Sequence, residues 1–188
     1  MKLIQTEIPD VVVIEPQVFS DERGWFMESF NEKSFYKQLN DLGLDKPRPF
    51  VQDNHSCSNK GVLRGLHYQT APHAQGKLVR VIRGSVFDVV VDIRPESATF
   101  GQHVSIELSA DNQKMFWVPE GFAHGFVALE DDTHFLYKTT DYYAKDCEAA
   151  IVWNDPKLSI QWPKLDKLVI HEKDSKASSF KDYNASQV

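Results

Sequence analysis

The sequence lacks a surplus of positive charge and any long apolar run. Its 188 residues carry 21 Lys and Arg against 27 Asp and Glu, a formal net charge of −6. A general nucleic-acid binder needs a basic surplus to neutralise phosphates, so that class is excluded, although a few local cations could still hold one phosphorylated ligand. No apolar stretch approaches the roughly 20 residues of a membrane span, and no basic, apolar leader follows Met1. We therefore expect a soluble cytoplasmic protein with neither a nucleic-acid nor a membrane partner.

Cysteine is also scarce. Cys57 and Cys147 lie far apart without metal-type spacing, which indicates two ordinary thiols of a reducing compartment. The hydrophobic fraction of 41% and the aromatic fraction of 12% exclude a disordered chain. No linker or repeat divides the sequence, so we expect one domain over residues 1–188. Its parts are an N-terminal section to about residue 50, a barrel core over about 51–165, and a C-terminal segment over about 166–188 that is a loose tail from about Ser175.

What the sequence has in abundance is short strands with alternating apolar and polar residues. Glycine, proline, asparagine and aspartate punctuate them at short intervals, which predicts a mainly β fold of the sandwich or jelly-roll barrel type with a few short helices. Gly84-Ser85 is expected to turn a hairpin between its flanking strands, and Ser29 and Glu32 are expected to form the capping box of one clear helix that stops at Gly43. The expected strands cover 2–8, 11–16, 77–83, 86–94, 102–108, 114–118, 126–129 and 133–140, and the helix covers 31–43.

The segment RGLHYQ, followed by GK, carries the polar groups most suited to chemistry. We expect Arg64, His67, Gln69 and Lys77 to point one way at the mouth of the barrel. A single histidine in a strand-rich protein is more often structural than catalytic. For His67, the neighbouring cations Arg64 and Lys77 favour a functional role, because they suit an anionic ligand or a developing negative charge.

With WVPEGFAHGF, which adds His124, this segment resembles the two half-motifs of cupins, small β-barrels that often bind a metal in the mouth. A cupin metal site needs about three histidines and a carboxylate. Gln69 stands where a second histidine is wanted, and Lys77 stands where a carboxylate is expected. The sequence therefore predicts a cupin-like barrel without a metal ion. For Tyr137, pattern alone favours core packing with the hydroxyl at the rim.

Seven blocks occur in one order over nearly the whole chain, and together they resemble a single enzyme family. The blocks are DERGWFMESF, FVQDNHSCSNKGVLRGLHYQ, QGKLVRVIRGSVFDVVVDIR, WVPEGFAHGF, FLYKTTDYY, WNDP and HEKDSKA. By this resemblance the chain is identified as a member of the dTDP-4-dehydrorhamnose 3,5-epimerase family, cofactor-free cupins of dTDP-L-rhamnose synthesis.

The resemblance implies roles for individual residues. His67 matches the catalytic base, Asp174 the carboxylate that orients it, Tyr137 the general acid, and Lys77 the cation beside the C4 oxygen of the sugar. The residues matched to binding of the dTDP-4-keto-6-deoxyhexose substrate are Arg23, Phe26, Glu28, Gln52, Asn54, Arg64, Lys77, His124, Glu148 and Lys173.

The resemblance also implies a homodimer, in which the N-terminal section packs on the partner and Arg23 or Glu28 serves the neighbouring site. Two departures from the family pattern stand out. Trp25 replaces the usual Phe, which looks harmless. Ala149-Ala150 replaces the usual Arg-Gly after Glu148, which puts the loop contacts there in doubt.

The implied reaction is chemically coherent without a cofactor. Hydrogens on the carbons beside a ketone are acidic because their removal gives an enolate, so a base, an acid and a cation suffice. Three alternatives stay open. One is an epimerase of a related dTDP-4-keto-6-deoxysugar that inverts C3 only or C5 only. The others are a metal-dependent cupin oxygenase and a non-catalytic module that binds a nucleotide sugar.

Overall fold

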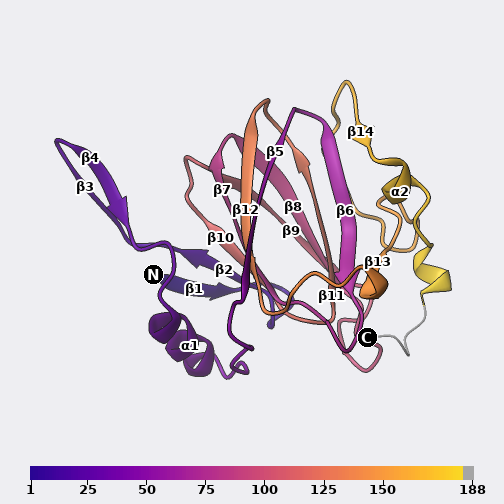
Figure 1. The fold of residues 1–188 in the computed structure, drawn as a ribbon, viewed down its shortest axis with the longest axis horizontal. Helices are drawn as coiled ribbons and strands as arrows, with labels where there is room; N and C mark the ends of the chain where they lie inside the picture. Colours follow the sequence, from indigo (N-terminus) through magenta and orange to yellow (C-terminus); the bar gives the residue numbers. More distant parts are fainter. Residues whose placement is uncertain (184–188) are drawn as a thin grey trace.

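Two antiparallel sheets face each other and enclose the core (Figure 1). The computed structural model describes residues 1–183. The first sheet has the order β1 (Lys2–Gln5), β2 (Val12–Glu15), β10 (Met115–Val118), β7 (Lys77–Arg83), β12 (Thr133–Thr139) and β5 (Gln52–Ser58). The second has the order β13 (Glu148–Ala150), β6 (Val62–Gln69), β11 (Phe122–Ala128), β8 (Ser85–Asp92) and β9 (His103–Ser109), and β14 (Val169–Ile170) pairs parallel to β6. The predicted mainly β, jelly-roll fold is confirmed.

The core between the sheets follows from the alternation of side chains along the strands. Val79 and Phe135 come from the first sheet, Val90 and Phe126 come from the second, and all four are at most 5% exposed. Because every second residue of a strand points to the same face, one apolar row from each sheet fills the interior. The interior therefore excludes water around any polar group that lies in it.

The expected hairpin through Gly84-Ser85 is wrong. β7 pairs with β10 and β12, whereas β8 pairs with β9 and β11, so the chain crosses from one sheet to the other at Gly84. Gly84 has a φ of 73°, and a Cβ there would lie 2.4 Å from Oγ1 of Thr133. The turn signal was correct, but a local pattern does not tell a hairpin from a crossing between sheets.

The helix α1 (Glu32–Asp41) forms as predicted, but its cap differs. Its N-cap is Asn31, whose side chain accepts a hydrogen bond from Ser34 N at 3.0 Å, so the expected capping box is wrong. The buried Phe35 and Leu39 pack with Trp117 on the outer side of the first sheet. Gly43 follows the helix with a φ of 76°, as a C-terminal glycine does.

The strands β3 (Val18–Asp21) and β4 (Gly24–Met27) form a hairpin that projects away from the two sheets, which we call the arm (Figure 1). Phe19, Trp25 and Phe26 in the arm are 55%, 59% and 69% exposed. A lone two-stranded hairpin is only marginally stable in water, and exposed large apolar side chains mark an interaction surface.

The C-terminal segment is packed along most of its length. After the one-turn η1 (Lys145–Cys147) and β14, the chain forms α2 (Glu172–Ser175) beside β6 and the one-turn η2 (Phe180–Asp182). The Tyr183 hydroxyl donates to the carbonyl of Ile93 at 2.6 Å, and Phe180 N donates to Asp155 at 2.8 Å. The expected loose tail from Ser175 is therefore wrong through Tyr183, and residues 184–188 lie outside the described part. Within residues 1–183, no helix is both long and apolar enough to cross a membrane.

Candidate active site

A bulge in β6 turns Arg64 and His67 into the same cavity. On a regular strand, residues three apart face opposite sides. His67 lies opposite His124 on β11 and Arg64 lies opposite Phe126, so three steps along β6 match two along β11. The bulge lies at Gly65, whose φ is 131° and where a Cβ would lie 2.5 Å from Gly125 Cα. Glycine is therefore required at Gly65, both by the backbone angle and by the close approach of β11.

That cavity, of about 670 Å³, gathers five of the predicted site residues between β6, β13 and α2. They are Arg64, His67, Glu148, Lys173 and Asp174. These residues are far apart in the sequence, and the pairing of β13 and β14 with β6 brings them together.

His67 and Asp174 form a hydrogen-bonded pair. Nε2 of His67 donates to Oδ1 of Asp174 at 2.7 Å, and Gly65 N donates to Oδ2 at 3.1 Å. Burial alone would raise the pKa of Asp174, but the hydrogen bonds and the nearby imidazoles more than offset it and hold that pKa below its ordinary value. An ionised carboxylate only accepts hydrogen bonds, so Nε2 carries the hydrogen and Nδ1 of His67 keeps a lone pair that can take a proton.

Lys77 lies under this pair, on the opposite sheet. Its residue is 8% exposed, and Nζ donates to the carbonyl of His67 at 3.2 Å. Burial lowers the pKa of Lys77 to about 8, against the partly compensating charges of Asp88 and Glu148. Most of the ammonium is therefore protonated at neutral pH, in surroundings that strengthen its field.

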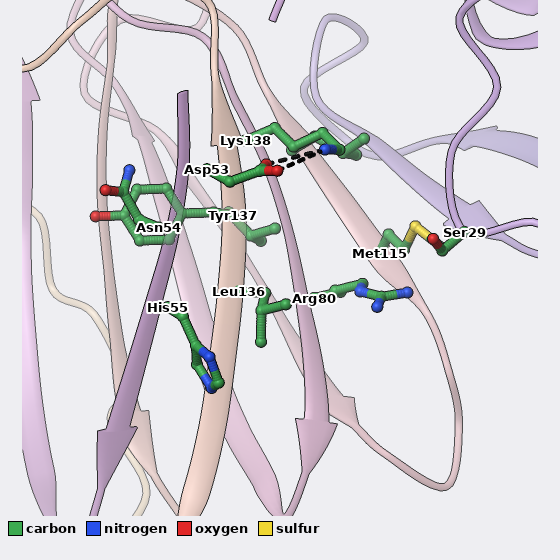
Figure 2. A pocket seen from close by; sticks show the side chains of 11 residues that line it. Ser29, Asp53, Asn54, His55, Arg80, Met115, Leu136, Tyr137 and Lys138 are labelled. Carbon is green, nitrogen blue, oxygen red and sulfur yellow. Dashed lines mark hydrogen bonds and ion pairs between the residues drawn. The ribbon is translucent and has the colours of Figure 1, made fainter. Parts of the chain in front are cut away.

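Tyr137 on β12 points into the barrel. Figure 2 shows Tyr137 and Asn54 on one side of their strands, with Arg80 and Met115 on the other. Tyr137 borders a hollow of about 280 Å³ on the outer side, but its ring packs against the core beside Phe135. Burial raises the pKa of Tyr137, against the opposing charge of Arg64, so the phenol is protonated at neutral pH.

The rim of the site contains a residue that the sequence did not single out, Tyr143. Its hydroxyl donates to Oε2 of Glu148 at 2.8 Å, and Lys173 forms an ion pair with the same oxygen at 2.5 Å. Burial would raise the pKa of Glu148, but the bonds from Lys173 and Tyr143 lower it overall. Despite Ala149-Ala150, β13 pairs in register with β6, with Glu148 opposite Gln69. The second tyrosine of TTDYY was the one available signal for Tyr143.

Gln69 holds the loop at the rim of the site through its side-chain amide. Its Nε2 donates to the carbonyls of His73 at 2.6 Å and Tyr142 at 3.1 Å, and its Oε1 accepts from Ala144 N at 2.8 Å. Its donors and acceptor are thereby occupied. Gln69 is two residues from His67 in a regular part of β6, so it lies on the same face, as predicted, with its amide bonded to the backbone of the rim loop. Within residues 1–183, no group of three or more His, Cys, Asp or Glu side chains is arranged to hold a metal ion.

Gln52 and Asn54 on β5 lie near the same rim. Gln52 donates to Asn54 at 3.0 Å and accepts from Tyr143 N at 3.1 Å. His124 faces the interior and is bonded to Asp88, which sequence reasoning missed because one acidic residue in SVFDVVVD carries no motif.

Arg23, Phe26 and Glu28 are the predicted residues that the fold does not bring to this site. Arg23 and Phe26 lie on the arm, which Figure 1 shows at the opposite end of the molecule from β6 and α2, and Glu28 directly follows it. In this chain, Arg23 pairs with Asp21.

Comparison with known proteins places this geometry in a family. The family model described as dTDP-4-dehydrorhamnose 3,5-epimerase matches residues 5–182. The chain is 53% identical over 182 residues to the dTDP-4-dehydrorhamnose 3,5-epimerase of Shigella flexneri, covering 97% of both sequences. This chain belongs to the dTDP-4-dehydrorhamnose 3,5-epimerase family.

Solved structures agree with this placement. The dTDP-6-deoxy-D-glucose-3,5-epimerase of Legionella pneumophila in complex with dTDP-4-keto-L-rhamnose superposes with a TM-score of 0.91 at 47% identity, covering 98% of this chain and 95% of that one. A 3′-monoepimerase of Streptomyces bikiniensis in complex with dTDP-quinovose superposes with a TM-score of 0.86 at 31% identity, covering 96% of this chain and 88% of that one. The prediction of an isomerase of the epimerase family is confirmed, and the roles of single residues stay predictions.

In this epimerase-family protein, the bulge at Gly65 can be tested against a matched glycine. Gly24 has a similar φ of 124°, but a Cβ there would meet nothing within 4 Å. We expect Gly24→Ala to cost at most the backbone strain of about 1–3 kcal/mol, and Gly65→Ala to cost about 2 kcal/mol more because it also clashes with β11. Chemical denaturation measures both free energies of unfolding, and equal losses would refute the close-approach argument.

Proposed function

We propose that the protein inverts C3 and C5 of dTDP-4-dehydro-6-deoxy-D-glucose to give dTDP-4-dehydro-L-rhamnose, by proton transfer through an enolate. The observation that carries the proposal is the pairing of His67 with Asp174 above the buried ammonium of Lys77. It supplies a base with a free lone pair and a cation within one site. These are the groups that proton removal beside a ketone needs.

In the proposed first step, Nδ1 of His67 takes the proton from the carbon beside the C4 ketone. The C–H bonding electrons form the enolate double bond, and the negative charge moves to the C4 oxygen. Asp174 stabilises the resulting imidazolium and stays ionised, as its lowered pKa requires. The Asp174 carboxylate also fixes the orientation of the His67 ring. The His67 side chain therefore does not have to be ordered during the reaction.

Lys77 is the proposed partner of the C4 oxygen. A preorganised cation in a site with little water stabilises a developing oxyanion by roughly 3 kcal/mol or more. With a pKa of about 8, the ammonium donates at neutral pH and is a stronger hydrogen-bond donor than an ordinary lysine.

Tyr137 is the proposed acid that returns a proton from the other face of the sugar ring. The raised pKa of its buried phenol keeps the proton in place until the carbanion carbon accepts it. The same base and acid then serve the second carbon, since C3 and C5 adjoin the same ketone. Before that step the imidazolium of His67 releases its proton to solvent and the phenolate of Tyr137 takes one up from solvent. The net result at each centre is removal of a proton on one face and delivery on the other.

The rim groups suit the nucleotide diphosphate. Arg64 and Lys173 supply positive charge, which favours the diphosphate oxygens. Gln52 and Asn54 offer amides at the same edge, and His124 adds an imidazole inside the barrel. Because Glu148 binds both Lys173 and Tyr143, it holds this rim together before ligand arrives.

We further propose that the protein is a homodimer whose arm completes the neighbouring site. The arm exposes Phe19, Trp25 and Phe26 and lies at the opposite end of the molecule from β6, the strand that carries His67, which supports binding of the arm to a second copy.

Incubating the protein with the 4-keto sugar in heavy water tests the reaction. We expect deuterium at both C3 and C5, detected by NMR of the recovered nucleotide sugar, because each inverted carbon receives a solvent proton. Deuterium at one carbon only would instead identify a single-centre epimerase. This alternative is relevant because the chain is also similar in structure to a 3′-monoepimerase. Absence of exchange would refute proton-transfer chemistry.

Replacing Tyr137 by Phe tests the acid. We expect product formation to fall by about 10²–10⁴-fold, whereas washout of label from the substrate carbon falls much less, because His67 still removes the proton. Tyr68→Phe is the control, since Tyr68 is a buried tyrosine that packs against Tyr183. A parallel loss of washout and product in Tyr137→Phe would contradict the assignment.

Mixed dimers test the arm. One subunit carries His67→Ala with an intact arm, and the other carries Phe26→Asp with an intact His67. If the arm serves the partner, roughly a quarter of the sites in a random mixture combine an intact base with an intact arm, so activity returns on mixing two nearly inactive proteins. No recovery, with mixed dimers verified by mass, would show that the arm does not act across the dimer.

A further inference from the structure

Asp88 is a buried carboxylate that the proposed proton transfers do not use. It lies on β8 in the otherwise largely apolar stretch SVFDVVVD, and it is 0% exposed. A carboxylate that is fully removed from water is unfavourable unless it is paired and hydrogen-bonded. Burial raises the pKa of Asp88, and the imidazole of His124 and the ammonium of Lys77 act against that rise. The carboxylate therefore depends on these partners.

Its direct partner is His124. Nε2 of His124 lies 2.9 Å from Oδ1 and 3.0 Å from Oδ2 of Asp88, so one N–H bridges both oxygens. The face of the imidazole stacks on Phe135, with ring centroids 6.1 Å apart and an interplanar angle of 26°. The carboxylate and the phenyl ring together fix the position of the His124 ring.

The register of the second sheet sets this pair beside the proposed base. His124 lies directly opposite His67 across β11 and β6, and Asp88 reaches His124 from β8 on the other side. Two histidine–carboxylate pairs are thus neighbours: His67, His124 and Asp88 come from the adjacent strands β6, β11 and β8, and Asp174 comes from α2. Asp174 holds one ring and Asp88 holds the other.

Asp88 also acts on Lys77. The carboxylates whose charge acts on this ammonium are those of Asp88 on β8 and Glu148 on β13, and Asp88 has the larger effect. Nζ of Lys77 donates to the backbone carbonyl of His67, and His67 lies opposite His124 across β6 and β11. In a dry interior, an ammonium without a nearby anion gives up its proton.

We propose that Asp88 is a positioning residue of the reaction, which fixes the His124 ring beside His67 within the buried cluster of polar groups that includes Lys77. This inference rests on the proposed function, because it concerns the cation that receives the enolate oxygen. Its repulsion of the enolate is the smaller effect, since a neutral Lys77 amine would offer no charge to the oxyanion. No bond is made or broken at Asp88.

Asp88→Asn tests this proposal, because it keeps the shape and removes the charge. We expect kcat to fall about 10- to 100-fold at neutral pH. In the wild type, kcat should decline as the pH rises through about 8, the pKa of Lys77. In the variant that decline should begin at lower pH, because loss of a nearby negative charge lowers the pKa of an ammonium.

Asp92→Asn is the matched control. Asp92 is a second fully buried aspartate on the same strand, but it binds Arg94, Ser97 and Thr99 at the far end. We expect Asp92→Asn to lower the melting temperature and to leave the alkaline decline of kcat in place. A shift of that decline in Asp92→Asn, or none in Asp88→Asn, would overturn the proposal.

A measurement on the wild type covers the case in which Asp88→Asn does not fold. Long-range nitrogen–proton NMR of the histidines should find the His124 proton on Nε2 at neutral pH, and a neutral ring protonated on Nδ1 would overturn the proposal. The heavy-water experiment distinguishes failure of the role proposed for Asp88 from failure of the proposed function. If the wild type exchanges carbon-bound hydrogen but Asp88→Asn behaves like the wild type, only this inference fails, whereas no exchange in the wild type removes the proposed function itself.

Discussion

The hydrogen bond between His67 and Asp174 is the interaction on which the rest of the site depends. It joins β6 to α2 across 107 residues of sequence, and it needs Asp174 to stay ionised while almost fully buried. Gly65 N contributes the second bond, so the bulge that aims His67 also holds its partner. The C-terminal segment must therefore pack onto β6 for His67 to be oriented as a base.

Burial acts on the two other proposed catalytic groups in opposite and useful directions. It lowers the pKa of the Lys77 ammonium and raises the pKa of the Tyr137 phenol, because both shifts disfavour the charged form. Each group nevertheless stays protonated at neutral pH. The same dry interior that stabilises the fold thus prepares one donor for the enolate oxygen and one proton source for the carbon. Asp88 and Glu148 limit the shift of Lys77 so that burial does not remove its charge.

Exposed large apolar side chains are more frequent in the arm than on the two sheets. The two sheets bury their apolar faces well, whereas the arm presents Phe19, Trp25 and Phe26 to solvent and pairs with no other strand among residues 1–183. The predicted arm residues therefore lie away from the site on β6 and α2 of their own subunit. A second copy would cover the apolar hairpin and bring Arg23 and Glu28 to a site whose rim already carries Arg64 and Lys173.

Local sequence pattern was sufficient for the helix, the motifs and many of the strands, because side-chain periodicity and turn residues act over a few positions. The strand through Tyr137 and the helix α1 were predicted correctly, whereas β5, β6 and the arm strands β3 and β4 were not among the expected strands. The partners of each strand were not predicted, because Gly84 favours a turn equally well in a hairpin and in a crossing between sheets. The same limit hid Tyr143, Asp88 and the loop contacts of Gln69, and it led to the wrong expectation of a loose tail up to Tyr183. Their contacts are made with groups distant in sequence, and a carboxylate becomes a buried charge, or an amide a clamp on a loop, only when packing removes the water around it.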